Sequence, residues 1–230
     1  MNHTAPELAD RPSDLAAVCV KIVKSTHMGF YEDRILPHLV HLSMRQDTLS
    51  AYRRRLVSGA QGRVLEIGVG SGLNFRFYTD GVRQVVGLDT SPRLLSMARQ
   101  VPSAAAPIAL VEGSAEALPM EDQSIDTVVT TWTLCTIPDV AGALREVRRV
   151  LRSSGQLLFV EHGRSPDARV RRWQDRLTPV WKPLAGGCHL NRPIRELLED
   201  AGLRIERIET GYMKGPKPMT FMYEGRARPL

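Results

Sequence analysis

The sequence predicts an α/β fold in which a mostly parallel sheet is covered by helices on both faces. Runs of β-branched and apolar residues, typical of buried strands, occur at 63–67, 84–88, 108–111, 127–131 and 156–160. Segments with helical patterns lie between these runs, and that alternation is typical of a parallel sheet. The last two runs, 203–209 and 220–226, follow one another without a helix. We therefore expect them to pair as an antiparallel hairpin that ends the sheet.

Residue types at the segment ends define the expected helices. Ser91 is followed by a proline, which predicts a helix at 92–99, because a serine hydroxyl caps free backbone N–H groups and proline fits the first turn. A second helix is expected at 139–151. A third, at 192–201, is closed by Gly202, since glycine readily adopts the left-handed conformation that ends many helices.

The first quarter of the chain precedes this alternation. We expect residues 1–56 to form an N-terminal helical cap, broken at Pro37, and residues 57–230 to form the main domain. The longest apolar run near the N-terminus, 15–20, is too short to cross a bilayer, which takes about 20 apolar residues. The segment also lacks the pattern of a secretion signal, so a cytoplasmic protein is predicted.

An insertion is expected at about 165–189, over the edge of the sheet that binds ligands. It is predicted to hold a helix followed by a Pro- and Gly-rich loop, and it carries Trp173 and Trp181. We therefore expect this segment to take part in substrate binding.

Charge and cysteine content limit the classes of function. The net charge of +6 and the arginines grouped at 53–55, 145–152 and 169–172 would suit a nucleic acid. Each group falls within a helical pattern that has apolar residues at its other positions, so we expect solvent-exposed helix faces and no nucleic-acid partner. The three cysteines are Cys19, Cys135 and Cys188. Their wide separation, without a CxxC pair, predicts buried free thiols and no metal site.

The stretch VLEIGVGSG, residues 64–72, is typical of a strand that runs into a glycine-rich turn. Gly68, Gly70 and Gly72 are spaced G-x-G-x-G, instead of the G-x-G-x-x-G of dinucleotide sites. Glu66 at the strand end would repel a pyrophosphate and attract an amino group. The free N–H groups of a helix expected after the last glycine would suit a single carboxylate. Together these groups predict a site for an amino-acid moiety.

Asp89 follows the second strand, about twenty residues after the glycine turn. A carboxylate at this position accepts hydrogen bonds from both hydroxyls of a ribose, which NAD also carries. An amino-acid site next to a ribose site fits S-adenosylmethionine (SAM). The sequence therefore predicts SAM as the cofactor.

Four motifs resemble, in order and spacing, those of class I SAM-dependent methyltransferases: VLEIGVGSG, GLDTSPRLLSMAR, GSAEALPMEDQSIDTVV and ALREVRRVLRSSGQLLFVEH. The resemblance covers about residues 60–162. It implies a Rossmann-like, seven-stranded sheet with an antiparallel last strand, in agreement with the hairpin expected above. It also implies that Gly68, Gly70 and Gly72 line the methionine part of SAM and that Asp89 binds the ribose.

The same resemblance places three further residues near the cofactor. Ser114 and Ala115 fall where these enzymes contact adenine, and Thr131 falls where they approach the methionine moiety. The first adenine position usually carries an aspartate, and a serine accepts the hydrogen of the adenine amino group less strongly. Ser114 therefore predicts weaker cofactor binding or a substitute contact.

Groups that contact the methyl acceptor are expected from the cap, the ends of the fourth and fifth strands and the insertion. His162, at the end of the fifth strand, is placed to act as a base or as a structural hydrogen-bonding group. His189 is a second catalytic candidate. The candidates for the wall of the substrate pocket are Tyr31, Trp132, Trp181 and Cys188.

A finer resemblance concerns the acceptor. DTVVTTWTLCTI, LLFVEHGR and WQDRLTPVWKPLAGGCHLNR are similar to segments of the small-thiol S-methyltransferase branch. This similarity implies S-methylation of a small thiol, whose thiolate is available without a strong base at a pKa near ~8.5. The alternatives are N-methylation of phosphatidylethanolamine, for which peripheral membrane contact stays open, and C-methylation of a quinone ring. A SAM-binding protein without catalytic activity is a further alternative.

Overall fold

The computed structural model describes residue 29, residues 31–102 and residues 106–230. These residues form a seven-stranded sheet with the strand order β3-β2-β1-β4-β5-β7-β6. The strands are β1 (Gly62–Ile67), β2 (Val82–Asp89), β3 (Ile108–Glu112), β4 (Ile125–Thr131), β5 (Leu151–His162), β6 (Leu203–Tyr212) and β7 (Phe221–Pro229). β1 to β5 pair in parallel, whereas β7 lies between β5 and β6 and is antiparallel to both. The predicted fold is confirmed.

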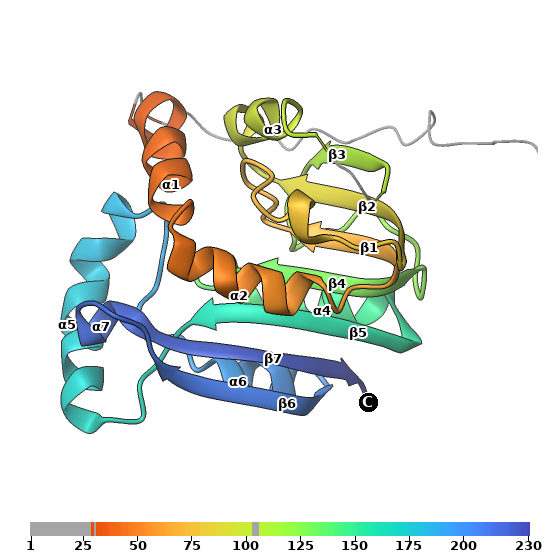
Figure 1. Cartoon of the computed structure of the whole chain (residues 1–230). Helices are drawn as coiled ribbons and strands as arrows, with labels where there is room; N and C mark the ends of the chain where they lie inside the picture. The colour runs from red at the N-terminus through yellow and green to blue at the C-terminus, as the bar shows by residue number, and fades with distance from the viewer. Residues whose placement is uncertain (1–28, 30, 103–105) are drawn as a thin grey trace, which may run out of the picture.

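Helices cover both faces of the sheet (Figure 1). They are α1 (Leu36–Met44), α2 (Asp47–Val57), α3 (Pro92–Ala98), α4 (Val140–Val150), α5 (Ala168–Leu184), α6 (Ile194–Asp200) and the single turn α7 (Lys217–Thr220). Buried residues of α2 and α3 pack in one core cluster, and those of α4 and α6 pack in a second cluster on the opposite face. Each face of the sheet is therefore closed by its own hydrophobic layer.

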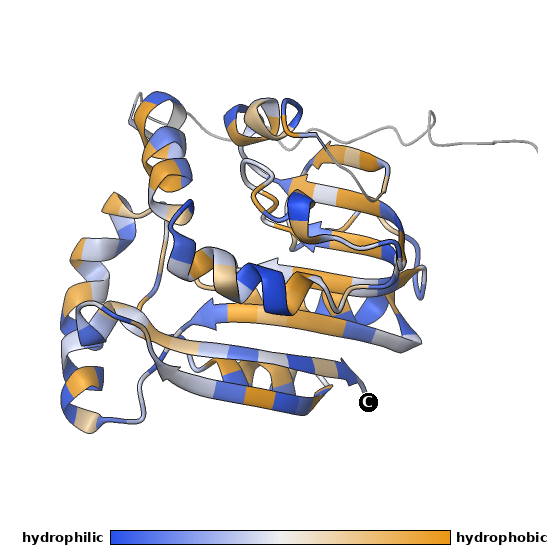
Figure 2. Ribbon diagram, in the orientation of Figure 1, coloured by the Kyte–Doolittle hydropathy of each residue, from blue (hydrophilic) through white to orange (hydrophobic). Residues whose placement is uncertain are grey.

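Helix α4 shows how the sequence builds one of these layers. The helix begins at Asp139, whose carboxylate accepts a hydrogen bond of 2.9 Å from the backbone N–H of Gly142. Its apolar residues recur at helical spacing and are buried: Val140, Ala143, Leu144, Val147 and Val150. In Figure 2 the hydrophobic colouring is concentrated on the central strands β4 and β5. Burial against this apolar surface holds α4 in place.

The N-terminal part of the described chain differs from the prediction at Pro37. A π-helical turn (Tyr31–Ile35) continues directly into α1, so the proline does not break the helix. Pro37 lies in the first turn of α1, where its missing N–H group has no intrahelical partner to lose. The apolar run 15–20 and Cys19 lie outside the described residues. The division into a cap and a main domain after residue 56 stays a prediction.

The segment expected as an insertion also differs from the prediction. A helix followed by a loop is present as predicted, but α5 extends over 17 residues and carries Trp173 and Trp181, which were expected in the loop. Asp167 caps its first turn by accepting hydrogen bonds from two backbone N–H groups. Among the described residues, no helix has the length and apolar character needed to cross a membrane.

Helices α1 and α5 lie beside one edge of the sheet. The parallel strands all end at this edge, as their arrowheads show in Figure 1. The hydroxyl of Tyr31 donates a hydrogen bond of 3.0 Å to the carbonyl oxygen of Leu184, so the turn before α1 contacts the end of α5. The carboxyl ends of the strands are therefore flanked by two helices that are joined to each other.

We expect Leu144→Ala to lower the free energy of unfolding by about 2–5 kcal/mol, because Leu144 is fully buried between α4 and the sheet and its loss leaves a cavity. Leu42→Ala is the matched control, since Leu42 is 66% exposed and its replacement should change stability by less than about 0.5 kcal/mol. Denaturant unfolding of the three proteins measures both values. Equal effects of the two substitutions would contradict the described packing.

Candidate functional site

The candidate site lies where the sheet reverses its strand order. From β1 the chain proceeds to β2 and β3 on one side and later to β4 and β5 on the other. In open α/β sheets, ligands bind outside the carboxyl ends of the strands at such a switch point. The strands that end here terminate in Ile67, Asp89, Thr131 and His162. The functional side chains predicted from the sequence therefore converge on this edge.

The glycine turn after β1 has two kinds of glycine. Gly68, Gly70 and Gly72 all have positive φ angles, of 70°, 56° and 78°. A Cβ atom on Gly68 would meet the side chain of Thr133 at 2.2 Å, and one on Gly72 would meet the ring of Phe75 at 2.6 Å. A Cβ atom on Gly70 would have no described atom nearer than 3.9 Å. The first and last glycines are thus required by internal packing, whereas Gly70 borders open space that suits a ligand.

Asp89 is held between this turn and α3. Its Oδ2 accepts a hydrogen bond of 2.8 Å from the backbone N–H of Gly70, and its Oδ1 accepts one of 2.9 Å from that of Ser91. Burial raises the pKa of Asp89, and these hydrogen bonds oppose the increase. A carboxylate accepts up to about four hydrogen bonds, so Asp89 keeps capacity for a hydroxyl donor. The geometry suits the ribose-binding role predicted for Asp89.

Glu66 is enclosed at the end of β1 and accepts two hydrogen bonds from side chains. Asn74 Nδ2 donates to its Oε1 at 2.9 Å, and the Tyr78 hydroxyl donates to its Oε2 at 2.7 Å. Burial raises the pKa of Glu66 to about 7 despite these bonds. Asn74 Nδ2 also lies 3.2 Å from Thr131 Oγ1 and so joins Glu66 to the end of β4. Sequence reasoning missed both Asn74 and Tyr78.

The segment after Gly72 corrects one expectation. It forms a short 3-10 helix (Phe75–Phe77) instead of an α-helix with free N–H groups for a carboxylate. The positive group near Glu66 is instead the side chain of an arginine. Arg53 of α2 is only 4% exposed, although the sequence placed it on a solvent-exposed face. Its charge interacts with that of Glu66, and burial lowers its pKa to about 10.

Two nitrogens of the Arg53 guanidinium lack hydrogen-bond partners in the described part of the chain. Its Nε and Nη1 have no hydrogen-bond partner among the described residues, while its Cζ lies 4.6 Å from the centre of the Trp132 ring. An unpaired buried cation is costly, and a carboxylate ligand would satisfy it. With Glu66, it gives the site one group for an ammonium and one for a carboxylate. This pair fits the amino-acid moiety that the glycine turn predicts.

Trp132 directly follows β4 and has a strained backbone. Its φ of 53° lies in the left-handed region, which a residue with a large side chain rarely adopts and which costs about 1–3 kcal/mol. Its ring packs edge-on against Tyr52 of α2, with 6.3 Å between ring centres, and lies over Arg53. Helix α2 therefore holds this indole at the switch point.

A cluster of soft side chains lies at the end of β5. His162 Nε2 is 3.2 Å from Cys188 Sγ, and the indole N–H of Trp181 donates to the same sulfur at 3.3 Å. Cys135 Sγ belongs to the same group of atoms. The structure thus brings together His162, Cys188 and Trp181, which the sequence had proposed, with Cys135, which it had predicted only as a buried thiol.

His189 and Tyr31 have other contacts. His189 Nδ1 lies 3.1 Å from the carbonyl oxygen of Cys135 and 3.2 Å from Arg192 Nη2. The backbone N–H of His189 donates to the same carbonyl at 2.9 Å. This residue therefore joins the loop after β4 to the loop before α6, and its catalytic role stays a prediction. The Tyr31 hydroxyl is bound to the end of α5 and not to the cluster at β5.

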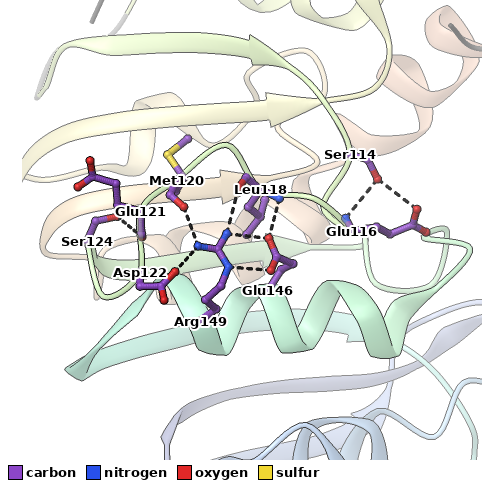
Figure 3. A network of polar contacts seen from close by, with 9 residues as sticks. All are labelled: Ser114, Glu116, Leu118, Met120, Glu121, Asp122, Ser124, Glu146 and Arg149. Atoms are coloured by element: carbon purple, nitrogen blue, oxygen red, sulfur yellow. Dashed lines mark hydrogen bonds and ion pairs between the residues drawn. The ribbon is translucent and has the colours of Figure 1, made fainter. Parts of the chain in front are cut away.

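The loop expected to contact adenine is fixed to α4 by Arg149 (Figure 3). The guanidinium donates to the carbonyl oxygens of Leu118 at 3.0 Å and Met120 at 2.8 Å. It also pairs with Glu146 at 2.7 Å and with Asp122 at 2.6 Å. This arginine orders the loop through backbone contacts, a role that its place in a basic cluster did not indicate.

Ser114 lies at the start of that loop. Its Oγ accepts a hydrogen bond from the backbone N–H of Glu116 at 3.2 Å, and it donates to a carboxylate oxygen of the same residue at 3.3 Å. The other carboxylate oxygen accepts from the N–H of Asp139 at 2.7 Å. The Ala115 side chain is buried in the core, so only its backbone is available to a ligand. Adenine contact by these two residues stays a prediction.

We expect Glu66→Gln to gain stability relative to the wild type as the pH rises. Because burial raises the pKa of Glu66 to about 7, the folded protein holds this proton more tightly than the unfolded chain. The wild type therefore loses roughly 2 to 3 kcal/mol between about pH 5 and pH 8, and the glutamine variant does not. Denaturant unfolding without cofactor at both pH values checks this. A constant difference between the two proteins would contradict the effect.

The comparisons with known proteins place the chain in a family. The methyltransferase domain family matches residues 65–159. Thiol S-methyltransferase TMT1B of Homo sapiens is 34% identical over 177 residues, which are 74% of this chain and 70% of that protein. Phosphatidylethanolamine N-methyltransferase of Cereibacter sphaeroides is 34% identical over 174 residues, which are 72% of this chain and 81% of that protein.

Solved structures agree on the fold. A SAM-dependent methyltransferase from Thermotoga maritima superimposes with a TM-score of 0.62 at 20% identity, covering 86% of this chain and 97% of that chain. This similarity concerns the fold, which in this chain is the seven-stranded sheet with its helices. The chain belongs to the class I SAM-dependent methyltransferases, with SAM as its cofactor.

Proposed function

We propose that this methyltransferase transfers the methyl group of SAM to the sulfur of a small thiol. The similarity to human thiol S-methyltransferase TMT1B spans 177 residues, whereas the methyltransferase domain family matches only residues 65–159. The similarity thus extends beyond the residues that the domain family matches. The observation in the structure that supports a sulfur acceptor is the cluster of two cysteines, a histidine and an indole at the end of β5.

In this proposal the two buried charges hold the amino-acid end of the cofactor. Glu66 accepts hydrogen bonds from the ammonium group of the ligand, and the unpaired nitrogens of Arg53 donate hydrogen bonds to the carboxylate of the ligand. Gly70 leaves room for close approach of the ligand, and Asp89 binds the ribose. When bound, SAM supplies an electrophilic methyl group.

The remaining task of the chain is to align the acceptor and to exclude water. The thiol reacts as its thiolate, so its proton is released to water before transfer. The sulfur then forms a bond to the methyl carbon as the bond to the sulfonium breaks, and S-adenosylhomocysteine is released. Because thiolates are available near a pKa of ~8.5, this reaction requires no strong base. Trp132 and Trp181 are the proposed walls of the acceptor pocket, and His162 stays a candidate for contact with the acceptor.

Phosphatidylethanolamine is the second candidate acceptor. The observation that favours it is the similarity to the Cereibacter sphaeroides enzyme, which is 34% identical and 81% covered. Glu161, the buried residue before His162, would offer a carboxylate to a cationic head group. The thiol is ranked first because thiol S-methyltransferases of human, rat and mouse are all similar to the chain, at 33–37% identity.

We expect purified protein to release S-adenosylhomocysteine from SAM with a small alkyl thiol and not with phosphatidylethanolamine vesicles. Asp89→Ala should weaken SAM binding by on the order of 100-fold, because hydrogen bonds to a charged group contribute about 1.5–3 kcal/mol each. Asp80→Ala is the matched control, since Asp80 is an exposed aspartate. Product release and calorimetric SAM binding measure these effects.

Each result separates the candidates. Release with vesicles or with a quinone precursor, and none with thiols, would overturn the thiol acceptor and leave the methyltransferase assignment intact. SAM binding without release for any of these acceptors would favour a non-catalytic SAM-binding protein.

Replacement of Arg53 by methionine should have opposite effects on stability and binding. Arg53→Met removes, at similar volume, a buried cation with two unsatisfied nitrogens, and Glu66, whose pKa is about 7, takes up a proton in its absence; the cofactor-free protein should therefore gain about 1 kcal/mol or more. Loss of the charged donor should weaken SAM binding by at least about 10-fold. Arg54→Met, at an exposed neighbouring position, should change neither value. An unstable Arg53 variant with normal SAM affinity would identify Arg53 as a packing residue.

A further inference from the structure

Three buried side chains at the end of β5 converge within a few ångströms. Cys135 Sγ, His162 Nε2 and Cys188 Sγ all lie within 4.8 Å of one another. All three residues are buried. They belong to the loop after β4, the last position of β5 and the loop between α5 and α6. Methyl transfer to a thiol does not itself require a metal ion, so an ion bound by this cluster would be an additional property of the protein.

The spacing of these atoms suits a tetrahedral ion. A zinc ion takes sulfur at about 2.3 Å and nitrogen at about 2.0–2.1 Å, so ligand atoms on a tetrahedron lie about 3.5–3.8 Å apart. The distance from His162 Nε2 to Cys188 Sγ is 3.2 Å, and the largest separation is no more than 4.8 Å. The separations of 3.2 Å to at most 4.8 Å lie on either side of the tetrahedral values, so the ligand atoms need only small movements to reach them.

The backbone already fixes the loops that carry the two sulfurs. The N–H of His189, next to Cys188, donates to the carbonyl oxygen of Cys135 at 2.9 Å. His162 is the last residue of β5, and its backbone pairs with Met222 of β7. The three ligand positions are thus set by hydrogen bonds of the sheet and the loops and do not depend on an ion for their approach.

Charge and hydrogen bonding also favour a bound cation. Two thiolates neutralise a divalent ion, which makes the buried group electrically neutral. The indole N–H of Trp181 points at Cys188 Sγ from 3.3 Å, and an N–H donor of this kind supports a metal-bound thiolate from outside the coordination sphere.

We propose that Cys135, His162 and Cys188 form a binding site for a borderline-soft divalent metal ion, of which Zn²⁺ fits best. Thiolate and imidazole ligands select such ions over Mg²⁺ or Ca²⁺, which prefer oxygen. Three protein ligands leave a fourth tetrahedral position open, as in catalytic zinc sites. The inference goes beyond the proposed function and does not depend on the identity of the methyl acceptor.

Cobalt(II) binding under reducing conditions tests this site. The full chain, with its thiols confirmed as reduced, is titrated with Co²⁺ and followed by absorption spectroscopy. We expect one ion per chain and a thiolate-to-cobalt charge-transfer band, which identifies sulfur ligands directly. Zn²⁺ should then displace Co²⁺, because it binds such ligands more tightly. This readout is independent of methyl transfer, so its failure is distinguishable from failure of the proposed function.

Matched variants assign the ligands. Cys135→Ser, Cys188→Ser and His162→Asn should each weaken Co²⁺ binding by more than about 100-fold, since even partners outside the coordination sphere contribute about 10–100-fold. Cys19→Ser and His189→Asn are the controls, and both should bind Co²⁺ as the wild type does. Calorimetric binding of S-adenosylhomocysteine shows that each variant is folded.

Three results would overturn the proposal. The first is less than about one tenth of an ion per reduced chain. The second is a cobalt spectrum without the charge-transfer band. The third is unchanged affinity in a folded protein that carries both Cys135→Ser and Cys188→Ser.

Discussion

The burial of the Glu66 carboxyl group determines many of the contacts on the cofactor-binding side of this protein. A carboxyl group enclosed at the end of β1 requires hydrogen-bond donors, and Asn74 and Tyr78 provide them. These two residues hold the chain after the glycine turn in an irregular path, in place of the α-helix that the sequence predicts. The charge of Glu66 also offsets part of the cost of burying Arg53, which lies on α2. Burial of Glu66 thus links the turn, the first helices and the sheet edge.

The two ends of the site differ in chemistry, and Trp132 lies between them. The cofactor end carries opposite charges and backbone donors, whereas the other end carries two sulfurs, an imidazole and an indole. The Trp132 ring covers Arg53, and its carbonyl oxygen accepts a hydrogen bond of 3.6 Å from Cys135. Trp132 makes both contacts from a left-handed backbone conformation, which is strained for a residue with a large side chain. Trp132 therefore connects the charged, cofactor-binding end of the site to the end that carries the two sulfurs, the imidazole and the second indole.

The strands, the final hairpin and the cofactor motif were predictable because each depends on neighbours in sequence. Ser91 and Gly202 act as expected: Ser91 caps α3, and Gly202 has a positive φ after α6. The side chains that complete the site were not predictable in this way, because distant segments bring them together. One missed signal was present, however. Arg53 occupies the same helical stripe as Leu49, Leu56 and Val57, which marks it as a buried position despite the arginines beside it.

The central claim is that Glu66 and Arg53 together bind the amino-acid end of the cofactor, and the most direct test is a crystal structure with S-adenosylhomocysteine. The account predicts that the ligand amino group lies against Glu66. It also predicts that the carboxylate accepts hydrogen bonds from Arg53 Nε and Nη1, and that the ribose hydroxyls donate to Asp89. A ligand whose carboxylate faces solvent, with Arg53 still unpaired, would contradict it.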